Sequence, residues 1–143
     1  MQLANVLLVD DEEPFVQTMV KRLTKRGFDV KYALNGHAAL NALAEHPNIE
    51  VVILDVKMPG MDGIETLREI KSRLPLMEVV MLTGHATVES AIEGMKQGAF
   101  DYLMKPCEIE TLVTKVEEAA ARKRAHDEKI EEARIKEIVS RRI

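Results

Sequence analysis

The segment Val6-Leu7-Leu8-Val9-Asp10-Asp11 joins four consecutive apolar residues to two acidic ones. Two later segments show the same arrangement, because residues 51–54 precede Asp55 and residues 79–82 precede Thr83. Continuous apolar runs of this length are typical of strands that are buried on both faces, as in a parallel sheet covered by helices. The pattern therefore predicts three central strands of an α/β sheet, each followed directly by a polar residue.

The rest of the chain alternates between further strands and amphipathic helices. More mixed segments at 30–33 and 99–103 predict two strands nearer the edges of the sheet. Apolar residues at helical spacing predict five helices, marked by residues 15–23, 39–43, 64–74 and 88–95 and by a last segment that begins near Cys107. Five strand-then-helix units imply a doubly wound α/β fold with a parallel sheet. We predict the flavodoxin-like strand order 2-1-3-4-5, because it places the three most apolar strands at the centre.

The last helix is expected to extend well beyond the sheet. From residue 108 to about residue 140 the chain contains neither Pro nor Gly, and alanines are frequent. The net charge is −7 over residues 1–120 and +3 over residues 121–143. This change predicts one domain over 1–120 and a helical C-terminal extension over 121–143. The extension is interpreted as a solvated tail, a short dimerising coiled coil or a linker helix, since its apolar seam is interrupted.

Composition excludes several classes of protein. The single Cys excludes a disulfide framework, and no apolar run approaches the roughly 20 residues of a membrane helix. The N-terminus lacks the features of a signal peptide, so a soluble, cytoplasmic protein is expected. The net charge of −4 and the five aromatic residues argue against direct nucleic-acid binding. The basic run Arg122-Lys123-Arg124 is accordingly expected to be a solvated helix face.

The polar residues that follow the strands are expected to meet at one edge of the sheet. Asp10, Asp11, Asp55 and Thr83 follow parallel strands, and Lys105 follows the fifth strand. Two carboxylates about 4 Å apart repel by roughly 4 kcal/mol at an effective dielectric constant near 20, so three of them require cations. Oxygen ligands without a nearby His or thiolate favour Mg2+, which together with Lys105 would neutralise the cluster.

A site of this kind can accept a phosphoryl group. The metal, the Lys105 ammonium and a hydroxyl would bind the phosphoryl oxygens, and an Asp could then approach phosphorus as a nucleophile. Asp10 and Asp11 lie in an acidic run that suits metal binding, whereas Asp55 stands alone after a buried strand. We therefore predict Asp55 as the phosphoryl acceptor, and the backbone carbonyl of Lys57 as a further metal ligand.

Four motifs together resemble the receiver domains of bacterial two-component response regulators. They are Leu7-Leu8-Val9-Asp10-Asp11-Glu12, Leu54-Asp55-Val56-Lys57-Met58-Pro59-Gly60-Met61-Asp62-Gly63, Met81-Leu82-Thr83-Gly84-His85, and Gly98-Ala99-Phe100-Asp101-Tyr102-Leu103-Met104-Lys105-Pro106. The resemblance extends from about residue 3 to 120, and it is closest to receivers of nitrogen-regulator-type transcription activators. It supports the strand order 2-1-3-4-5, for which a receiver of this family is a known example.

The resemblance also implies a set of roles. Asp55 would be phosphorylated by a sensor histidine kinase or a phosphotransfer protein, with Mg2+ held by Asp10, Asp11, Asp55 and the Lys57 carbonyl. Lys105 and Thr83 would contact the phosphoryl group, and Tyr102 would swing inward behind Thr83. The Lys105–Pro106 peptide would be cis, as an X–Pro bond can be. Phosphorylation would remake the surface formed by segments 88–95, 99–103 and 107 onward, where an unidentified downstream protein or a second copy of the chain would bind.

Three alternatives remain open at this stage. The chain could be the receiver fragment of a larger transcription activator, since it contains no phosphate-binding Gly-rich loop and no helix-turn-helix of its own. It could be a constitutive dimer held by the C-terminal helix. A haloacid-dehalogenase-type phosphatase is disfavoured because those enzymes need an Asp two residues after the nucleophile, where this chain has Lys57.

Overall fold

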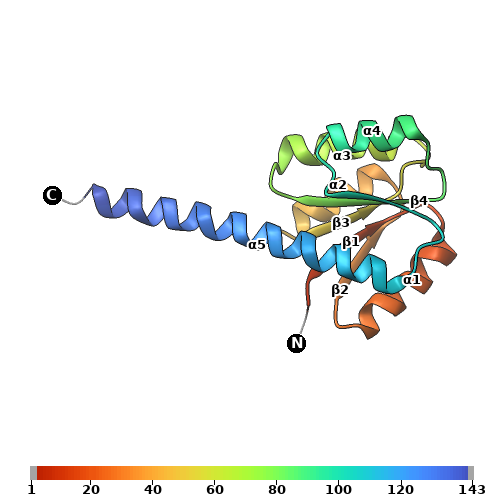
Figure 1. Cartoon of the computed structure of the whole chain (residues 1–143), viewed down its shortest axis with the longest axis horizontal. Coiled ribbons are helices and arrows are strands. Elements are labelled where there is room, and N and C mark those ends of the chain that lie inside the picture. The colour runs from red at the N-terminus through yellow and green to blue at the C-terminus, as the bar shows by residue number, and fades with distance from the viewer. Residues whose placement is uncertain (1–2, 142–143) are drawn as a thin grey trace.

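Five parallel strands form the sheet of the computed structural model, which describes residues 3–141 (Figure 1). The strands are β1 Asn5–Val9, β2 Asp29–Ala33, β3 Val51–Leu54, β4 Glu78–Thr83 and β5 Asp101–Met104. They lie in the order β2-β1-β3-β4-β5, and every neighbouring pair is parallel. The predicted strand order is therefore confirmed, and so is the doubly wound α/β fold.

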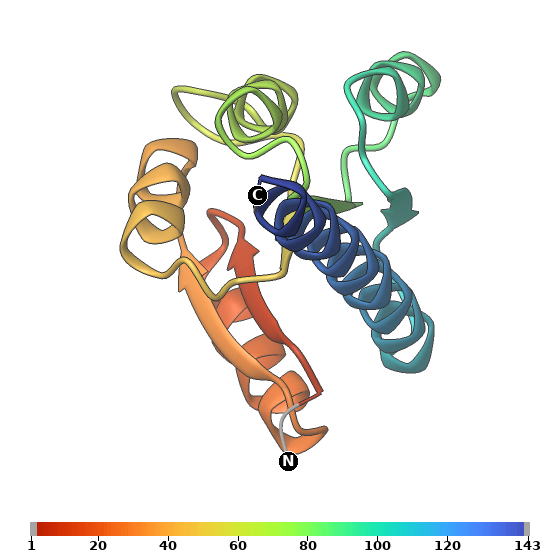
Figure 2. The same ribbon diagram turned by 90° about the vertical axis from the view of Figure 1, so that its left-hand side faces the viewer.

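Helices cover both faces of the sheet. They are α1 Glu13–Lys25, α2 Gly36–Glu45, α3 Gly63–Arg73, α4 Val88–Lys96 and α5 Ile109–Ser140. Apolar residues of α1 and α5 pack in one core cluster, and those of α2 and α3 pack in the other. Figures 1 and 2 show α1 and α5 on one side of the sheet and α2, α3 and α4 on the opposite side.

The central strands supply the core on both faces because their side chains alternate between the two clusters. In β1, Val6 and Leu8 pack toward α1 and α5, whereas Leu7 and Val9 pack toward α2 and α3. All four residues of β3 and all six of β4 are buried. Both faces of these strands are covered, which explains the uninterrupted apolar runs, and the two polar residues of β4, Glu78 and Thr83, stand at its ends.

Strand β5 begins later than the sequence pattern suggested. It starts at Asp101 instead of residue 99. Gly98 has a φ of 99°, and the N–H of Ala99 donates to the carbonyl of Gly94 at 3.0 Å. The chain therefore turns off the end of α4 before it joins the sheet, and an apolar residue in that turn is not a strand residue.

Helix α5 continues far past the sheet. Its buried residues end at Ala120, and the following turns project away from the domain (Figure 1). The last two residues of the predicted extension over 121–143 lie outside the described residues. Among residues 3–141, every helix is too short or too polar to cross a membrane, including α5.

Arg122 and Arg124 of the basic run are exposed to solvent, as the sequence predicts, but each also pairs with a carboxylate of the domain. Arg122 donates to both carboxylate oxygens of Glu78, which is 2% exposed, and Arg124 donates to both oxygens of Glu50. Arg124 also donates to the carbonyl of Leu3 at 2.9 Å. The physical reason is that α5 crosses the amino ends of the strands, where these two carboxylates need a cation.

Candidate functional site

The carboxyl ends of β1 and β3 bring three carboxylates together. Asp10, Asp11 and Asp55 each offer one oxygen, and these three oxygens lie within 4.8 Å of one another. The two strands are direct neighbours with Val9 opposite Leu54, so the residues that follow them meet at the same edge. Asp10 and Asp55 are each 1% exposed, whereas Asp11 is open to solvent.

The loop between β3 and α3 holds Asp55 in place. A Cβ atom at Gly63 would lie 1.9 Å from the carbonyl oxygen of Asp55, so no other residue fits there without moving the backbone. The Gly63 N–H donates to the carbonyl of Val56. Asp62 caps α3 by accepting the N–H of Glu65 at 2.8 Å. The Asp-Gly pair at this helix start therefore fixes the backbone that carries Asp55.

Lys105 crosses the same edge and binds Asp10. Its Nζ lies 2.6 Å from Asp10 Oδ2, and the backbone N–H of Glu12 donates to Asp10 Oδ1 at 2.9 Å. Burial lowers the pKa of Lys105, but its hydrogen bond and attraction to Asp10, together with the charges of Asp55 and Glu12, outweigh this and raise the pKa. The ammonium therefore stays charged. The Lys105–Pro106 peptide is cis.

Asp55 is less completely bonded than Asp10. Its Oδ1 accepts the N–H of Val56 at 2.8 Å. Among residues 3–141, its Oδ2 is the one buried side-chain nitrogen or oxygen without a hydrogen-bond partner. Burial raises the pKa of Asp55, and the Asp10 carboxylate adds to this, while Thr83 and Lys105 oppose it. A buried oxygen of this kind is costly unless a ligand completes its bonding.

The donor set fits a hard divalent cation. Three carboxylates and one ammonium leave a formal charge of −2, and all ligand atoms are oxygens. The unpartnered Asp55 Oδ2 independently favours a ligand at this edge. The residues therefore fit Mg2+.

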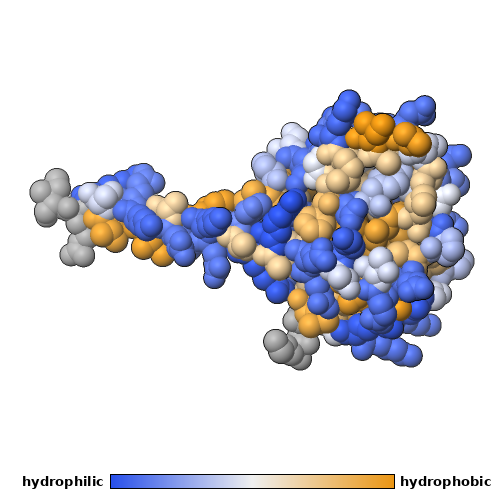
Figure 3. All heavy atoms as spheres, viewed as in Figure 1, coloured by the Kyte–Doolittle hydropathy of each residue, from blue (hydrophilic) through white to orange (hydrophobic). Residues whose placement is uncertain are grey.

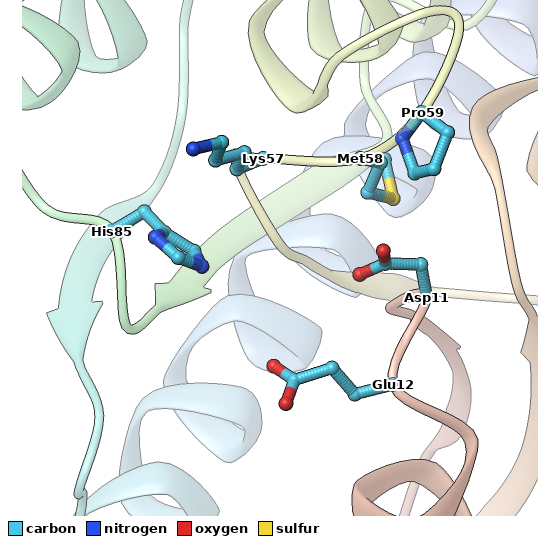
Figure 4. Close-up of a pocket in the computed structure, with 6 residues that line it drawn as sticks. All are labelled: Asp11, Glu12, Lys57, Met58, Pro59 and His85. Atoms are coloured by element: carbon cyan, nitrogen blue, oxygen red, sulfur yellow. The ribbon is translucent and has the colours of Figure 1, made fainter.

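A cleft of about 390 Å³ opens beside these carboxylates (Figure 4). Asp11 and Glu12 lie on one side of it, and Lys57 and His85 lie across from them. The backbone N–H of His85 donates to Thr83 Oγ1 at 3.0 Å, which places the buried Thr83 hydroxyl at this end of β4. A small ligand can thus reach the cluster from solvent.

Tyr102 is engaged with α4. Its hydroxyl lies 2.6 Å from Ser90 Oγ, and its ring faces Gly94 of the same helix. Ser90 also forms the α4 capping box with Thr87. Of the predicted site residues, the structure thus groups Asp10, Asp11, Asp55, Thr83 and Lys105 at the strand ends and leaves Tyr102 bonded to the first turn of α4.

The sequence did not predict that Lys105 contacts two further residues. Glu12 Oε1 lies 3.5 Å from Lys105 Nζ, and the Phe15 ring centroid lies 3.9 Å from it. The sequence assigned Phe15 only to the apolar face of its helix. Its position in the first turn after the acidic run was the available signal, because a helix that starts at the strand ends places its first turn beside the site.

The family model for the response regulator receiver domain matches residues 6–117. The chain belongs to this family. Its receiver domain is 44% identical over 115 residues to a putative NtrX-like response regulator from Rickettsia bellii. It is 38% identical over 119 residues to the DNA-binding transcriptional regulator NtrC from Salmonella typhimurium. The crystal structure of a response regulator receiver domain protein from Clostridium thermocellum superimposes with a TM-score of 0.81 at 39% identity, and covers 85% of this chain and 98% of that one.

The two curated relatives are much longer than this receiver domain. The matches cover 79% and 83% of this chain but only 24% and 25% of the relatives. The chain thus spans about a quarter of their length. The comparisons establish a receiver domain of two-component response regulators, as the sequence motifs predicted.

Proposed function

We propose that Asp55 accepts a phosphoryl group from a phosphohistidine of a sensor histidine kinase or a phosphotransfer protein. The observation that carries this proposal is Asp55 Oδ2, which is buried, unpartnered within residues 3–141 and close to two other carboxylates and Lys105. Asp10 is already bonded through both oxygens, and Asp11 is exposed. Asp55 is therefore the carboxylate best suited to form a new bond.

The transfer exchanges one bond to phosphorus for another. Asp55 Oδ2 forms a P–O bond, the P–N bond to the donor imidazole breaks, and its electron pair returns to that nitrogen. Lys105 would move from Asp10 toward the phosphoryl oxygens, and the Thr83 hydroxyl would donate to them. Asp10, Asp11, Asp55 and the Lys57 carbonyl would hold Mg2+, which offsets the negative charge of the phosphoryl group when bound.

The acyl phosphate would then shift the domain between two packings. It adds charge and acceptor oxygens that Thr83 and Lys105 bind in only one of the two states. Movement of Thr83 would allow Tyr102 to turn inward. Because the Tyr102 hydroxyl is bonded to Ser90, this movement would also release the first turn of α4. The face formed by α4, β5 and α5 would change as a result.

That face carries the apolar side chains that a partner would cover. The exposed ones are Val88, Ile92 and Met95 on α4 and Met104 on β5. Figure 3 shows the α4 residues as an apolar patch at the top of the domain. We propose that it binds a downstream protein or a second copy of the chain. The exposed Ile130, Ile135 and Ile138 of α5 provide a second surface for a dimer.

Phosphorylation of the chain with a small phosphodonor tests the proposal. Incubation with Mg2+ and acetyl phosphate should add one phosphoryl group, detected by mass spectrometry, and the Asp55→Asn variant should add none. The matched control is Glu50→Gln, which changes a carboxylate at the opposite end of the sheet. A persistent phosphoryl adduct on Asp55→Asn, or continuous turnover of a free phosphomonoester, would contradict the proposal.

A second candidate is that the receiver is one domain of a larger transcription activator. The observation that favours it is the greater length of the relatives, of which the matches cover only 24% and 25%; one of them is a DNA-binding regulator. Residues 1–120 would then form the receiver, and the α5 extension from residue 121 would be a linker helix. An antibody against the receiver should detect a product several times heavier than 16.1 kDa in source cells. A product of 16.1 kDa would exclude this candidate.

A further inference from the structure

The Lys105 ammonium has an aromatic neighbour that the proposed function does not use. Its Nζ lies 3.9 Å from the centroid of the Phe15 ring, in addition to its contacts with Asp10 and Glu12. Phe15 belongs to the first turn of α1, with Pro14 before it. This turn follows directly on the acidic residues after β1, so the ring is held beside the site by the start of the helix.

The ring adds to the groups that hold the ammonium in place. Two carboxylates contact Lys105: Asp10, whose side chain is 2% exposed, and Glu12, whose side chain is 61% exposed. A charge at an aromatic face is attracted by the ring quadrupole, and more strongly where water is excluded. The Lys105 side chain is only 15% exposed. The ring therefore adds an attraction to the charged ammonium that does not depend on a carboxylate.

Phe15 and Lys105 also line a second cleft, together with apolar groups of Met19, Pro106 and Leu112. Shortening residue 15 would enlarge this cleft and let more water reach the lysine side chain. The hydrated ammonium would then adopt more positions, because a lysine side chain has four rotatable bonds.

We propose that Phe15 is a positioning residue that holds the Lys105 ammonium at the phosphoryl site. This inference rests on the proposed function, because it assumes that Lys105 binds the phosphoryl group on Asp55. The ring is not expected to touch the phosphoryl group. It acts by keeping Nζ beside the buried Asp10, from which it can reach the incoming oxygens.

Comparison of wild type with the variants Phe15→Leu and Phe15→Tyr tests whether residue 15 must be aromatic or only apolar. With Mg2+ and acetyl phosphate, Phe15→Leu should be phosphorylated about three- to tenfold more slowly than wild type, which corresponds to a cation–π contact at a partly desolvated site. Phe15→Tyr retains the ring and should stay within about twofold of wild type. Mg2+ affinity should be equal in all three. Equal rates for wild type and Phe15→Leu, or equal slowing by Leu and Tyr, would overturn the proposal.

A double-mutant cycle with Lys105→Gln tests whether the ring acts through the lysine. In that background, Phe15→Leu should have no further effect on the rate. The same slowing with and without Lys105 would overturn the proposal. A second readout needs no phosphorylation: the ring current should shift the Lys105 side-chain proton resonances in wild type and Phe15→Tyr, and Phe15→Leu should lose that shift.

These experiments distinguish failure of the positioning role from failure of the proposed function on which it rests. If wild type takes up a phosphoryl group and Asp55→Asn does not, the proposed function stands, and the Phe15 variants alone decide the inference. If wild type takes up none, the proposed function fails, and the positioning role fails with it. A wild-type ring-current shift that persists in Phe15→Leu refutes the contact itself in either case.

Discussion

The two ends of the sheet bury carboxylates in opposite ways. At the amino end, Glu78 is bonded through both oxygens by Arg122, with Lys71 Nζ 3.8 Å away. At the carboxyl end, Asp10 and Asp55 share one lysine, and one oxygen of Asp55 has no partner within residues 3–141. Buried carboxylates are tolerated when they are paired and fully hydrogen-bonded. Glu78 at the first end is therefore fully paired, whereas Asp55 at the second end is incompletely hydrogen-bonded within the described residues.

The pKa values point the same way. Burial raises the pKa of Glu50, but bonds from Arg124 and from the Asn5 backbone N–H outweigh it, so that the pKa lies below its ordinary value of 4.5. Burial also raises the pKa of Asp55, and there the opposing groups do not outweigh it. The same chemical group is thus a saturated structural anion at one end and a poorly stabilised anion at the other. Incomplete hydrogen bonding, more than burial, distinguishes Asp55 from the carboxylates at the amino end.

The largest expected effect is on metal binding at the carboxyl end. Asp10→Asn removes one charged ligand and weakens the hold on Lys105, so Mg2+ affinity should fall by at least about tenfold. Glu50→Gln removes a carboxylate at the amino end and should leave the affinity unchanged. Isothermal titration calorimetry with MgCl2 measures both. Equal losses in the two variants would show that net charge, and not the site, controls binding.

The next effect concerns stability at the amino end. Arg122→Met leaves Glu78 buried beside Lys71 alone, and we expect the free energy of unfolding to fall by about 3 kcal/mol. The double variant Glu78→Gln/Arg122→Met removes the unpaired charge and should recover part of this loss. Urea unfolding gives both values. If the single variant is as stable as wild type, the amino-end pairs contribute nothing and the contrast between the ends is not one of stability.

A substitution of Asp55 at the carboxyl end should raise the free energy of unfolding, whereas Arg122→Met at the amino end should lower it. Asp55→Asn replaces an incompletely bonded buried carboxylate by a neutral side chain, so without Mg2+ the protein should become more stable by about 1–3 kcal/mol. Added MgCl2 should stabilise wild type more than the variant, because it completes the bonding of Asp55. A variant that is less stable than wild type without Mg2+ would mean that Asp55 is structural, like Glu78.

The sequence could predict the carboxyl end because its signals are local. Each apolar run is followed at once by a candidate site residue, and parallel strands bring such residues to one edge, as Asp10 and Asp55 show. The amino end depends on contacts across the fold. Arg122 and Glu78 are 44 residues apart, and their pairing requires knowing where α5 crosses the sheet. The Phe15 contact with Lys105 was hidden for the same reason.

The smallest expected effect is a dependence of stability on pH at the amino end of the sheet. Because the folded-state pKa of Glu50 is lowered, its pair with Arg124 contributes stability above the ordinary glutamate pKa of 4.5. That contribution is lost as pH falls through the lower folded-state value, where Glu50 becomes protonated. Arg124→Gln should therefore reduce the free energy of unfolding by about 1 kcal/mol near pH 7, since Arg124 is half exposed.

The difference between wild type and Arg124→Gln should shrink as pH falls below 4.5. Urea unfolding of both chains between pH 7 and pH 3 measures it, with Arg141→Gln, at an exposed pair at the C-terminal end of α5, as the control. A difference that stays constant to pH 3 would show that Arg124 acts through its bond to the Leu3 carbonyl. The bond to Leu3 does not titrate, so only a carboxylate partner makes the contribution of Arg124 depend on pH.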